Sequence, residues 1–269
     1  MLTYSREQFA DTVASDFEAR RRIRHTGAFN ESNVLAARGL QKGLGHPSTQ
    51  ALRVGERRVL PMTIVFLDLT DFTGRSFWDD PNDVADLAHA VLSGFIETVV
   101  KFGGHALGLR GDGLFAGFGG DAEFATAMAL AACAFALDAV DNAVNPWLDA
   151  NGIRKVQARA GVDAGDITFI RSGTEDHSEV NALGFAANFA AKCEKRAKSW
   201  EVIVGQTARQ ALPAHLHFSA HEKSPQSYER DGDRRYYHFY DFSWRRALPH
   251  LVDVPESLAG VASSDVYRR

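Results

Sequence analysis

Two aspartates stand where a carboxylate can do chemistry. Asp68 follows the run Thr63–Leu67 (TIVFL), whose β-branched and apolar composition is typical of a buried strand. A carboxylate at the end of such a strand is costly unless a cation, a hydrogen-bond donor or solvent meets it. Asp112 lies between two glycines, and an Asp-Gly pair between apolar runs is a strong hairpin signal. Each residue alone also has an ordinary explanation, as a strand-end cap or a turn residue.

Together the two carboxylates predict a metal site. A strand and the hairpin that follows it can lie side by side in one sheet, which would bring Asp68 and Asp112 together. The loop predicted at Leu69–Gly74 leaves backbone N–H groups, among them those of Phe72 and Thr73, free to face an anion. Mg²⁺ takes only one or two protein carboxylates and completes its shell with phosphate oxygens and water. We therefore expect a divalent cation that carries a polyphosphate.

The elements that position these residues follow from the apolar pattern. Strands are predicted where β-branched and apolar residues run together, and helices where apolar residues recur every three to four positions. Helices are expected around Phe9, Val13 and Phe17 and over residues 81–102, 121–148 and 184–197. Strands are expected over residues 61–69, 105–110, 114–118, 156–162, 166–170, 201–204 and 236–242, with Asp163-Ala164-Gly165 joining the fourth to the fifth.

This order of elements predicts an α+β fold. The expected architecture is a ferredoxin-like βαββαβ core with extra strands, in which helices cover one face of a mainly antiparallel sheet. Three parts are expected along the chain. They are a helical N-terminal arm and connector over residues 1–59, a main domain over residues 60–242 and a tail over residues 243–269.

Composition narrows the class of protein. The chain has 269 residues and a net charge of −4, which does not favour a nucleic-acid partner. We find no apolar run near the ~20 residues that span a bilayer and no apolar secretion segment at the start, so a cytoplasmic protein with no membrane partner is expected. Cys133 and Cys193 lie in alanine-rich helical sequence and are interpreted as packing residues.

The motifs resemble those of the class III nucleotidyl cyclases. Phe66–Thr73 (FLDLTDFT) resembles their first metal motif and Gly111–Gly113 their second. Asn181–Lys192 (NALGFAANFAAK) resembles a third motif on a helix. The resemblance extends over about residues 60–242. It implies the cyclase fold and a catalytic domain that closes a nucleoside triphosphate to a 3′,5′-cyclic monophosphate and pyrophosphate.

The resemblance also implies the metals and the assembly. Two divalent cations per site, Mn²⁺ or Mg²⁺, are expected at Asp68, Leu69 and Asp112. A head-to-tail homodimer is implied, with the metal-binding acids from one subunit and the third-motif helix from the other, so that a dimer holds two equivalent sites.

Two helix residues match the catalytic positions of the third motif. Asn188 falls on the asparagine that orients the ribose, and Lys192 falls where the family has an arginine that stabilises the transferring phosphate. They are one helical turn apart and share a face, while Phe185 and Phe189 are expected to face the core. A solvated polar face is the alternative. Lysine offers a point charge rather than a bidentate fork, and Arg196 could share its role.

One arginine of a later cluster is expected to bind the γ-phosphate. Arg230, Arg234 and Arg235 precede the last predicted strand. The alternative is that they are ordinary exposed arginines.

Base recognition is where the chain departs most from the purine cyclases. Adenylyl cyclases place a lysine, and guanylyl cyclases a glutamate, four residues before the second metal aspartate, where this chain has Gly108. The second base reader of adenylyl cyclases is an aspartate, and its place is taken by Asn181. The motif context FLDLTDFTGRSFW and GLRGDGLFAGFGG instead resembles the pyrimidine cyclases of bacterial Pycsar anti-phage systems.

Two side chains are candidate base readers in this context. Asn181 can donate and accept, so its amide could read uracil or, flipped, cytosine. Arg110 only donates and could suit the carbonyl oxygens of uracil, although an ordinary surface arginine is equally compatible. These residues favour UTP over CTP. The family implies that the cyclic product is a messenger in anti-phage defence that activates a separate effector.

The sequence has features of three other kinds of protein. An adenylyl or guanylyl cyclase with unusual base readers remains open, as does a non-catalytic nucleotide-binding module that kept the fold. The run Gly119–Phe124 (GGDAEF) resembles the GGDEF signature of diguanylate cyclases with one insertion. It follows a strand and opens a helix, however, and there Asp121 is expected to be a helix N-cap.

Overall fold

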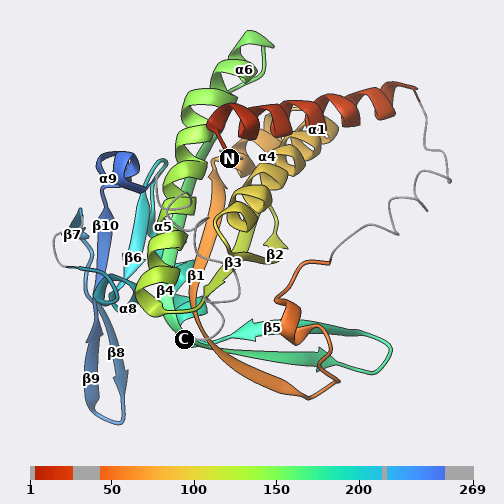
Figure 1. Cartoon of the computed structure of the whole chain (residues 1–269). Helices are drawn as coiled ribbons and strands as arrows, with labels where there is room; N and C mark the ends of the chain where they lie inside the picture. Colours follow the sequence, from red (N-terminus) through yellow and green to blue (C-terminus); the bar gives the residue numbers. More distant parts are fainter. Residues whose placement is uncertain (1–3, 27–42, 214–216, 252–269) are drawn as a thin grey trace.

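The protein folds around one mixed sheet, seen in the computed structural model, which describes residues 4–26, 43–213 and 217–251 (Figure 1). The strand order is β2-β3-β1-β4-β6-β10-β7, with β5 paired to β4 beside this path. Only β4 and β6 run parallel within it. The strands of the sheet are β1 (Arg57–Thr70), β2 (His105–Arg110), β3 (Gly113–Gly119), β4 (Gln157–Gly173), β5 (Ser178–Leu183), β6 (Val202–Gly205), β7 (Phe218–Ala220) and β10 (Phe239–Phe242).

Helices and a separate hairpin complete the described part. The hairpin is formed by β8 (Gln226–Arg230) and β9 (Asp233–Tyr237), and Figure 1 shows it extending away from the main sheet. The helices are α1 (Arg6–Thr26), α3 (Phe72–Trp78), α4 (Pro81–Lys101), α5 (Ala122–Ala139), α6 (Asn145–Ala150), α7 (Phe185–Arg196), α8 (Gln206–Gln210) and α9 (Trp244–Leu251). A short 3-10 turn, Pro47–Thr49, precedes β1. A π-helical turn, Val140–Val144, joins α5 to α6.

The central strand β1 has a helical cover on each side. Alternate side chains of a strand point to opposite faces. Val65 and Leu67 pack with α4 and α5, whereas Met62 and Ile64 pack with α7. The α+β class is confirmed, but the prediction that helices cover only one face is wrong. The continuous apolar run over residues 61–69 needs burial on both faces, and α7 supplies the second cover.

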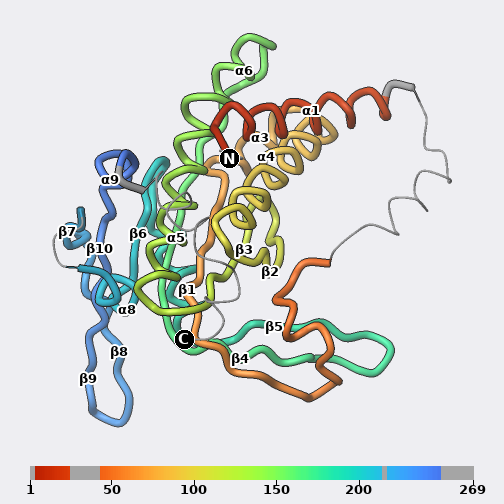
Figure 2. The backbone as a smooth tube through the Cα atoms, in the orientation of Figure 1, coloured from red at the N-terminus to blue at the C-terminus, as the bar shows by residue number. Residues whose placement is uncertain are grey.

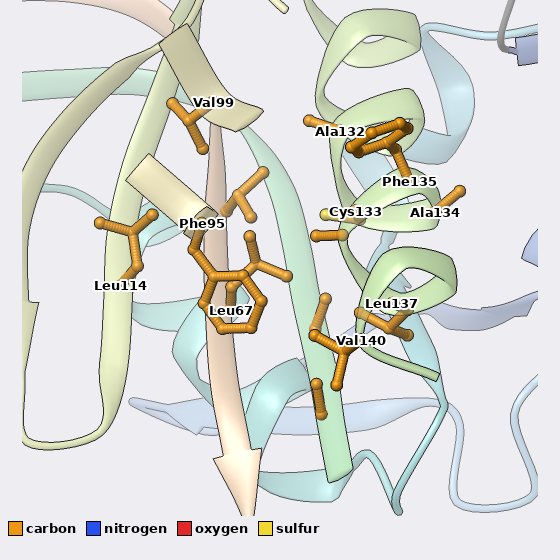
Figure 3. Close-up of a cluster of buried hydrophobic side chains, with 14 of the residues drawn as sticks. Leu67, Phe95, Val99, Leu114, Ala132, Cys133, Ala134, Phe135, Leu137 and Val140 are labelled. Atoms are coloured by element: carbon orange, nitrogen blue, oxygen red, sulfur yellow. The ribbon is translucent and has the colours of Figure 1, made fainter. Parts of the chain in front are cut away.

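The larger core cluster lies between β1, β3, α4 and α5. Figure 3 shows Leu67, Phe95 and Leu114 in this cluster together with Cys133 and Leu137 of α5. The alanine-rich sequence of α5 lets its backbone approach the sheet closely. The interpretation of the two cysteines as packing residues is confirmed, since both are buried and free.

One helical stretch of the described chain, Ala122–Ala150, is long and apolar enough to cross a membrane by length and composition. In its apolar window, 78% is buried inside the protein. It therefore serves as the core helix of this fold. Its N-terminus confirms the predicted cap, because the Asp121 carboxylate accepts hydrogen bonds from the backbone N–H groups of Glu123 and Phe124.

The predicted turn at Asp163-Ala164-Gly165 is wrong. Residues 157–173 form one continuous strand, β4, which pairs with β1 along its length. Asp163 lies opposite Ile64, and Gly165 lies opposite Met62. Asp and Gly favour turns locally, but the long register with β1 overrides that preference.

Several strands were missed or misplaced. The region predicted as a lead-in to a helix at Asn181 is strand β5, which pairs with the far end of β4. The strand predicted over residues 236–242 is two strands, β9 and β10. β7 and β8 were not predicted. These strands are short or polar, so they carry little apolar periodicity.

The N-terminal helix and the last helix share the main core. Phe9, Val13 and Phe17 of α1 are buried against α4, as their spacing predicts. Trp244 of α9 is buried in the same cluster and donates its indole N–H to the Trp200 carbonyl at 2.7 Å. The bounds 1–59, 60–242 and 243–269 stay a prediction, and residues 27–42 of the predicted arm and connector lie outside the described residues.

Candidate functional site

The sheet brings Asp68 and the Asp112 hairpin turn next to each other. Asp68 on β1 lies directly opposite Gly113, the first residue of β3. A Cβ on Gly113 would lie 3.0 Å from Asp68 Oδ1, so a larger residue there would crowd that carboxylate. Burial raises the pKa of Asp112, and the negative charge of Asp68 raises it further. The Asp112 carboxyl is therefore close enough to Asp68 to feel its charge.

An arginine that was not predicted holds Asp68. Arg159 lies opposite Asp68 on β4 and donates to its Oδ2 from Nε at 3.1 Å and from Nη2 at 2.8 Å. Its Nη1 donates to the Ala197 carbonyl at 3.2 Å. This ion pair, in which two N–H groups donate to one carboxylate oxygen, offsets the charge of Asp68 at the end of the strand.

A glutamate of α7 completes the cluster. Glu194 Oε1 lies 2.6 Å from Nη2 of Arg159, at ion-pair distance but without the angle of a hydrogen bond. Burial and then the charge of Asp68 raise the pKa of Glu194 to about 7, against the lowering effect of Arg159. Helix α7 reaches this position because it packs directly on β4. A Cβ on Gly161 would lie 2.1 Å from the Glu194 backbone nitrogen.

The donor set suits a hard divalent cation. Among the described residues, no group of three or more His, Cys, Asp or Glu side chains is arranged to hold a metal. Mg²⁺ and Mn²⁺ favour oxygen ligands, and Mg²⁺ needs only one or two carboxylates. Asp68 and Asp112 provide such a pair, and the buried Glu194 Oε1 is an oxygen acceptor without a hydrogen bond. The residues present therefore fit the expected cations.

Arg159 and Glu194 could have been suspected from the sequence. Arg159 is the only charged residue in the stretch Val156–Val162, which otherwise reads as a buried strand. Glu194 falls on the buried face of α7, four residues after Ala190. Their meeting with Asp68 depends on the pairing of β1 with β4, which the pattern alone does not give.

The segment after Asp68 differs from the predicted loop. Helix α3 starts at Phe72, so the loop predicted to reach Gly74 ends early. Asp71 makes the turn with a left-handed backbone, φ 57°. Phe72 and Thr73 lie in the first turn of α3, with the Phe72 side chain buried and Thr73 exposed. The Leu69 side chain is buried in the core, which leaves only its backbone for a metal.

The two candidate base readers share one pocket. Arg110 of β2 and Asn181 of β5 line a cavity of about 160 Å³ together with Phe115, Phe169 and His46. Gly108 does not line it. A Cβ at Gly108 would lie 3.6 Å from Arg110 Nη1. The guanidinium therefore occupies the space beside the position where purine cyclases carry a side chain.

Helix α7 presents its third-motif residues away from the sheet. Asn188 and Lys192 are exposed, one turn apart. Lys192 Nζ donates to the Tyr228 hydroxyl at 3.2 Å and lies 5.0 Å from the centre of that ring. Phe189 is buried as predicted, but Phe185 is 49% exposed and packs against the β8–β9 hairpin, so its predicted place in the core is wrong.

The remaining cationic candidates also lie on or against this hairpin. Arg196 donates to Gln226 and stacks on Phe239. Arg230 pairs with the neighbouring Asp231 at 3.2 Å, and Arg234 pairs with Glu229 at 2.8 Å. The side chains of Arg230, Arg234 and Arg235 are exposed. In the described part of the chain the side-chain partner of Asp68 is Arg159, and no contact joins Asp68 to these arginines, Asn188 or Lys192.

A larger cavity of about 270 Å³ lies elsewhere. It is formed by β6, β10 and α9 and is lined by Trp200, Asp241, Trp244 and their neighbours. None of the predicted site residues lines it. We therefore place the candidate site at the Asp68 end of the sheet.

Comparison with known proteins identifies the fold. No protein-family model matches the chain. A cytidylate cyclase of Escherichia coli is 23% identical over 178 residues, which are 62% of this chain and 38% of that protein. The match thus spans well under half of that relative's length.

Solved structures are more similar in shape than in sequence. The guanylyl cyclase Cya2 has a TM-score of 0.58 at 20% identity, covering 70% of this chain and 93% of its own. The adenylyl cyclase CyaB from P. aeruginosa has a TM-score of 0.60 at 19% identity, and the match covers 69% of this chain and 95% of CyaB. A bacterial light-regulated adenylyl cyclase has a TM-score of 0.64 at 14% identity, and the match covers 87% of this chain and 70% of that structure. The fold is that of the class III nucleotidyl cyclases, as predicted.

Proposed function

We propose that the protein is a nucleotidyl cyclase that converts a pyrimidine nucleoside triphosphate, UTP in preference to CTP, to its 3′,5′-cyclic monophosphate and pyrophosphate. The observation that carries this proposal is the juxtaposition of Asp68, Asp112 and Arg159 at one end of the sheet. Two carboxylates and a guanidinium group in one place suit the binding of a metal-bound triphosphate better than they suit packing alone. The shared fold supports the same reaction class.

The cations would be held by Asp68, Asp112 and the backbone of Leu69. Two divalent ions there, Mn²⁺ or Mg²⁺, would supply Lewis-acid activation of the ribose 3′-hydroxyl and neutralise charge on the phosphates. Arg159 already pairs with Asp68, and its planar guanidinium also suits phosphate oxygens. It would hold the triphosphate in register with the two acids.

Residues of this chain would bind and orient the ribose and the phosphates between which the new bond forms. The 3′-oxygen bonds to the α-phosphorus, the bond to the β-phosphate oxygen breaks, and the hydroxyl proton passes to solvent. Lys192 would offset the charge that develops on the α-phosphate, and Asn188 would orient the ribose. An arginine of the β8–β9 hairpin, Arg230 or Arg234, would bind the γ-phosphate, and the N–H groups of Phe72 and Thr73 would face the phosphates.

A second copy of the chain would complete the site. Asn188 and Lys192 point away from the sheet that carries their own Asp68, so one chain does not assemble the whole constellation. A head-to-tail homodimer would place them against the acids of the partner and give two equivalent sites.

The base pocket supports a pyrimidine. Gly108 has no side chain for reading a purine, and Arg110 and Asn181 are polar side chains of the neighbouring pocket. The donor-only Arg110 favours the carbonyls of uracil. CTP is the second candidate substrate, because the curated relative at 23% identity is a cytidylate cyclase. The product would act as a cytoplasmic messenger in anti-phage defence and activate a separate effector.

The test is direct. Purified protein is incubated with ATP, GTP, CTP or UTP and Mn²⁺ or Mg²⁺, and cyclic products are identified by mass. We expect cyclic UMP as the main product, and no product from Asp68→Asn or Asp112→Asn protein that melts cooperatively. Asp176→Asn, an exposed aspartate of the β4–β5 turn, is the matched control and should keep full activity. Product from purines alone would refute the pyrimidine assignment, and no product from any triphosphate would refute the cyclase.

A further inference from the structure

The segment before β1, residues 43–56, is fastened to the sheet near the candidate base pocket. The Gly45 N–H donates to the Ala106 carbonyl of β2 at 2.8 Å, and the Gly55 N–H donates to the Arg171 carbonyl of β4 at 2.9 Å. The Arg171 guanidinium donates back to the Leu52 and Gln50 carbonyls. Figures 1 and 2 show this segment, in orange, beside β5. Its position is thus set by contacts to β2 and β4.

This segment carries a histidine into the wall of the pocket. The His46 ring lies edge-on to His105 of β2, with 4.6 Å between ring centres, and 5.9 Å from the ring of Phe169 on β4. His46 lines the same cavity of about 160 Å³ as Arg110 and Asn181. A residue from outside the three motifs therefore shares the space of the candidate base readers.

The hydrogen bonds of His46 determine which ring nitrogen carries the proton. The Ser48 backbone N–H donates to His46 Nδ1 at 3.3 Å, and the Ser48 hydroxyl lies 2.8 Å from the same atom. A backbone N–H only donates, so Nδ1 is the acceptor and bears no proton. Burial, and then the nearby His105 and Arg58, lower the pKa of His46, which keeps the ring neutral at pH 7.

His46 is consequently a hydrogen-bond donor through Nε2–H. Among the described residues, Nε2 has no hydrogen-bond partner. The pocket then offers donors from His46 and Arg110 and an amide from Asn181 that can both donate and accept. Uracil presents two carbonyl oxygens and one N–H between them. Cytosine replaces one of those carbonyls with an amino group, which would meet a donor with a donor.

We propose that His46 is a specificity-determining residue that closes this pocket and donates from Nε2–H to the carbonyl that uracil has and cytosine lacks, so that a uracil nucleotide binds better than a cytosine nucleotide. This rests on the proposed function, because it takes the pocket of Arg110 and Asn181 as the base site. The proposal adds a base-binding residue from the segment before β1 to Arg110 and Asn181, which are the base-binding residues expected from the sequence.

The experiment measures binding rather than turnover. The 3′-deoxy analogues of UTP and CTP, which lack the hydroxyl that reacts, are titrated calorimetrically, with Mg²⁺, into the wild-type protein and then into a His46 variant. His46→Phe keeps a ring against His105 and Phe169 but has no N–H donor. We expect its ratio of UTP to CTP affinity to fall about tenfold, the effect of losing one hydrogen bond in a desolvated site. His46→Gln, which keeps an N–H donor, should retain most of the preference.

Control and outcomes separate the two proposals. His238→Ala removes an exposed histidine and should leave the ratio unchanged. An unchanged ratio in folded His46→Phe and His46→Ala protein would overturn the role of His46, as would a failure of the wild-type protein to bind either analogue. If wild-type protein makes no cyclic nucleotide while the binding ratio still falls in His46→Phe, the cyclase proposal fails and the role of His46 as a base reader stands.

Discussion

Asp163 is a fully buried carboxyl group, and replacing it with asparagine should change how stability depends on pH. It lies in β4, and its carboxylate accepts hydrogen bonds from the Tyr237 hydroxyl at 3.0 and 3.1 Å and from the Ala208 N–H at 3.4 Å. Gly205 packs so closely that a Cβ there would lie 2.4 Å from the carboxyl carbon. Burial outweighs the hydrogen bonds and raises the pKa of Asp163 to about 7.

The sign of the effect follows from proton binding. The folded protein keeps the proton on Asp163 up to about pH 7, while the unfolded chain releases it near the ordinary pKa of 3.8. The contribution of Asp163 to the free energy of unfolding is therefore fully present below pH 3.8 and is lost as the pH rises through 7. Each pKa unit is worth about 1.4 kcal/mol, so raising the pH from 5 to 8 should cost the folded state about 3 kcal/mol through this residue.

The assay is urea unfolding at pH 5 and pH 8 for the wild-type protein and Asp163→Asn. Asparagine fits the site, because its oxygen can accept from the Ala208 N–H while its NH₂ donates to the Tyr237 oxygen. We expect the variant to gain about 3 kcal/mol over the wild type between the two pH values. The exposed Asp176→Asn serves as the control and should follow the wild type. Parallel pH dependence of the wild type and Asp163→Asn would refute the reasoning.

Other predictions concern α7 and its partners. Lys192→Ala should lower kcat about 100-fold with little change in KM. Tyr228→Phe keeps the ring beside the ammonium group and should lower kcat much less. An effect of Lys192→Ala on KM alone would contradict the role of Lys192. Gly161→Ala should destabilise the protein by at least about 3 kcal/mol in urea unfolding, because its Cβ would meet the α7 backbone at 2.1 and 2.2 Å. Gly119→Ala is the control and should change stability little, because its Cβ would meet only a methionine methyl at 4.0 Å. Equimolar mixing of inactive Asp112→Asn and Lys192→Ala protein should restore about a quarter of the wild-type rate if sites are shared between subunits, since half of the dimers would be mixed and each would hold one intact site. No recovery after verified subunit exchange would argue against shared sites.

Local patterns were sufficient for the elements that carry the two acids. The apolar run before Asp68, the Asp-Gly hairpin at Asp112 and the N-cap at Asp121 each depend on residues within a few positions of one another. The structure has β1, the β2–β3 hairpin and α5 at these places. Asn188 and Lys192 also lie on one exposed face of α7, as helical spacing requires. Their roles in catalysis stay predictions.

Local patterns failed where pairing between distant segments decided the outcome. Asp163 and Gly165 have the composition of a turn, yet pairing with β1 makes them part of one long strand. β5 has only Val180 and Ala182 as a short apolar alternation, and it pairs with the end of β4 on the edge where β6 pairs only with residues 160–162. Phe185 has the sequence position of a core residue, but the β8–β9 hairpin covers it instead.

The sequence by itself determined the α+β class, the main strands and helices, and the two acidic positions, because these follow from side-chain periodicity and turn chemistry over short stretches. Only the tertiary structure decided that Arg159 and Glu194 join Asp68, and that His46 enters the wall of the pocket with Arg110 and Asn181. These contacts join residues far apart in the chain. They exist because hydrogen-bond register and the burial of both sheet faces bring the strands and α7 into one arrangement, which periodicity within a single segment does not encode.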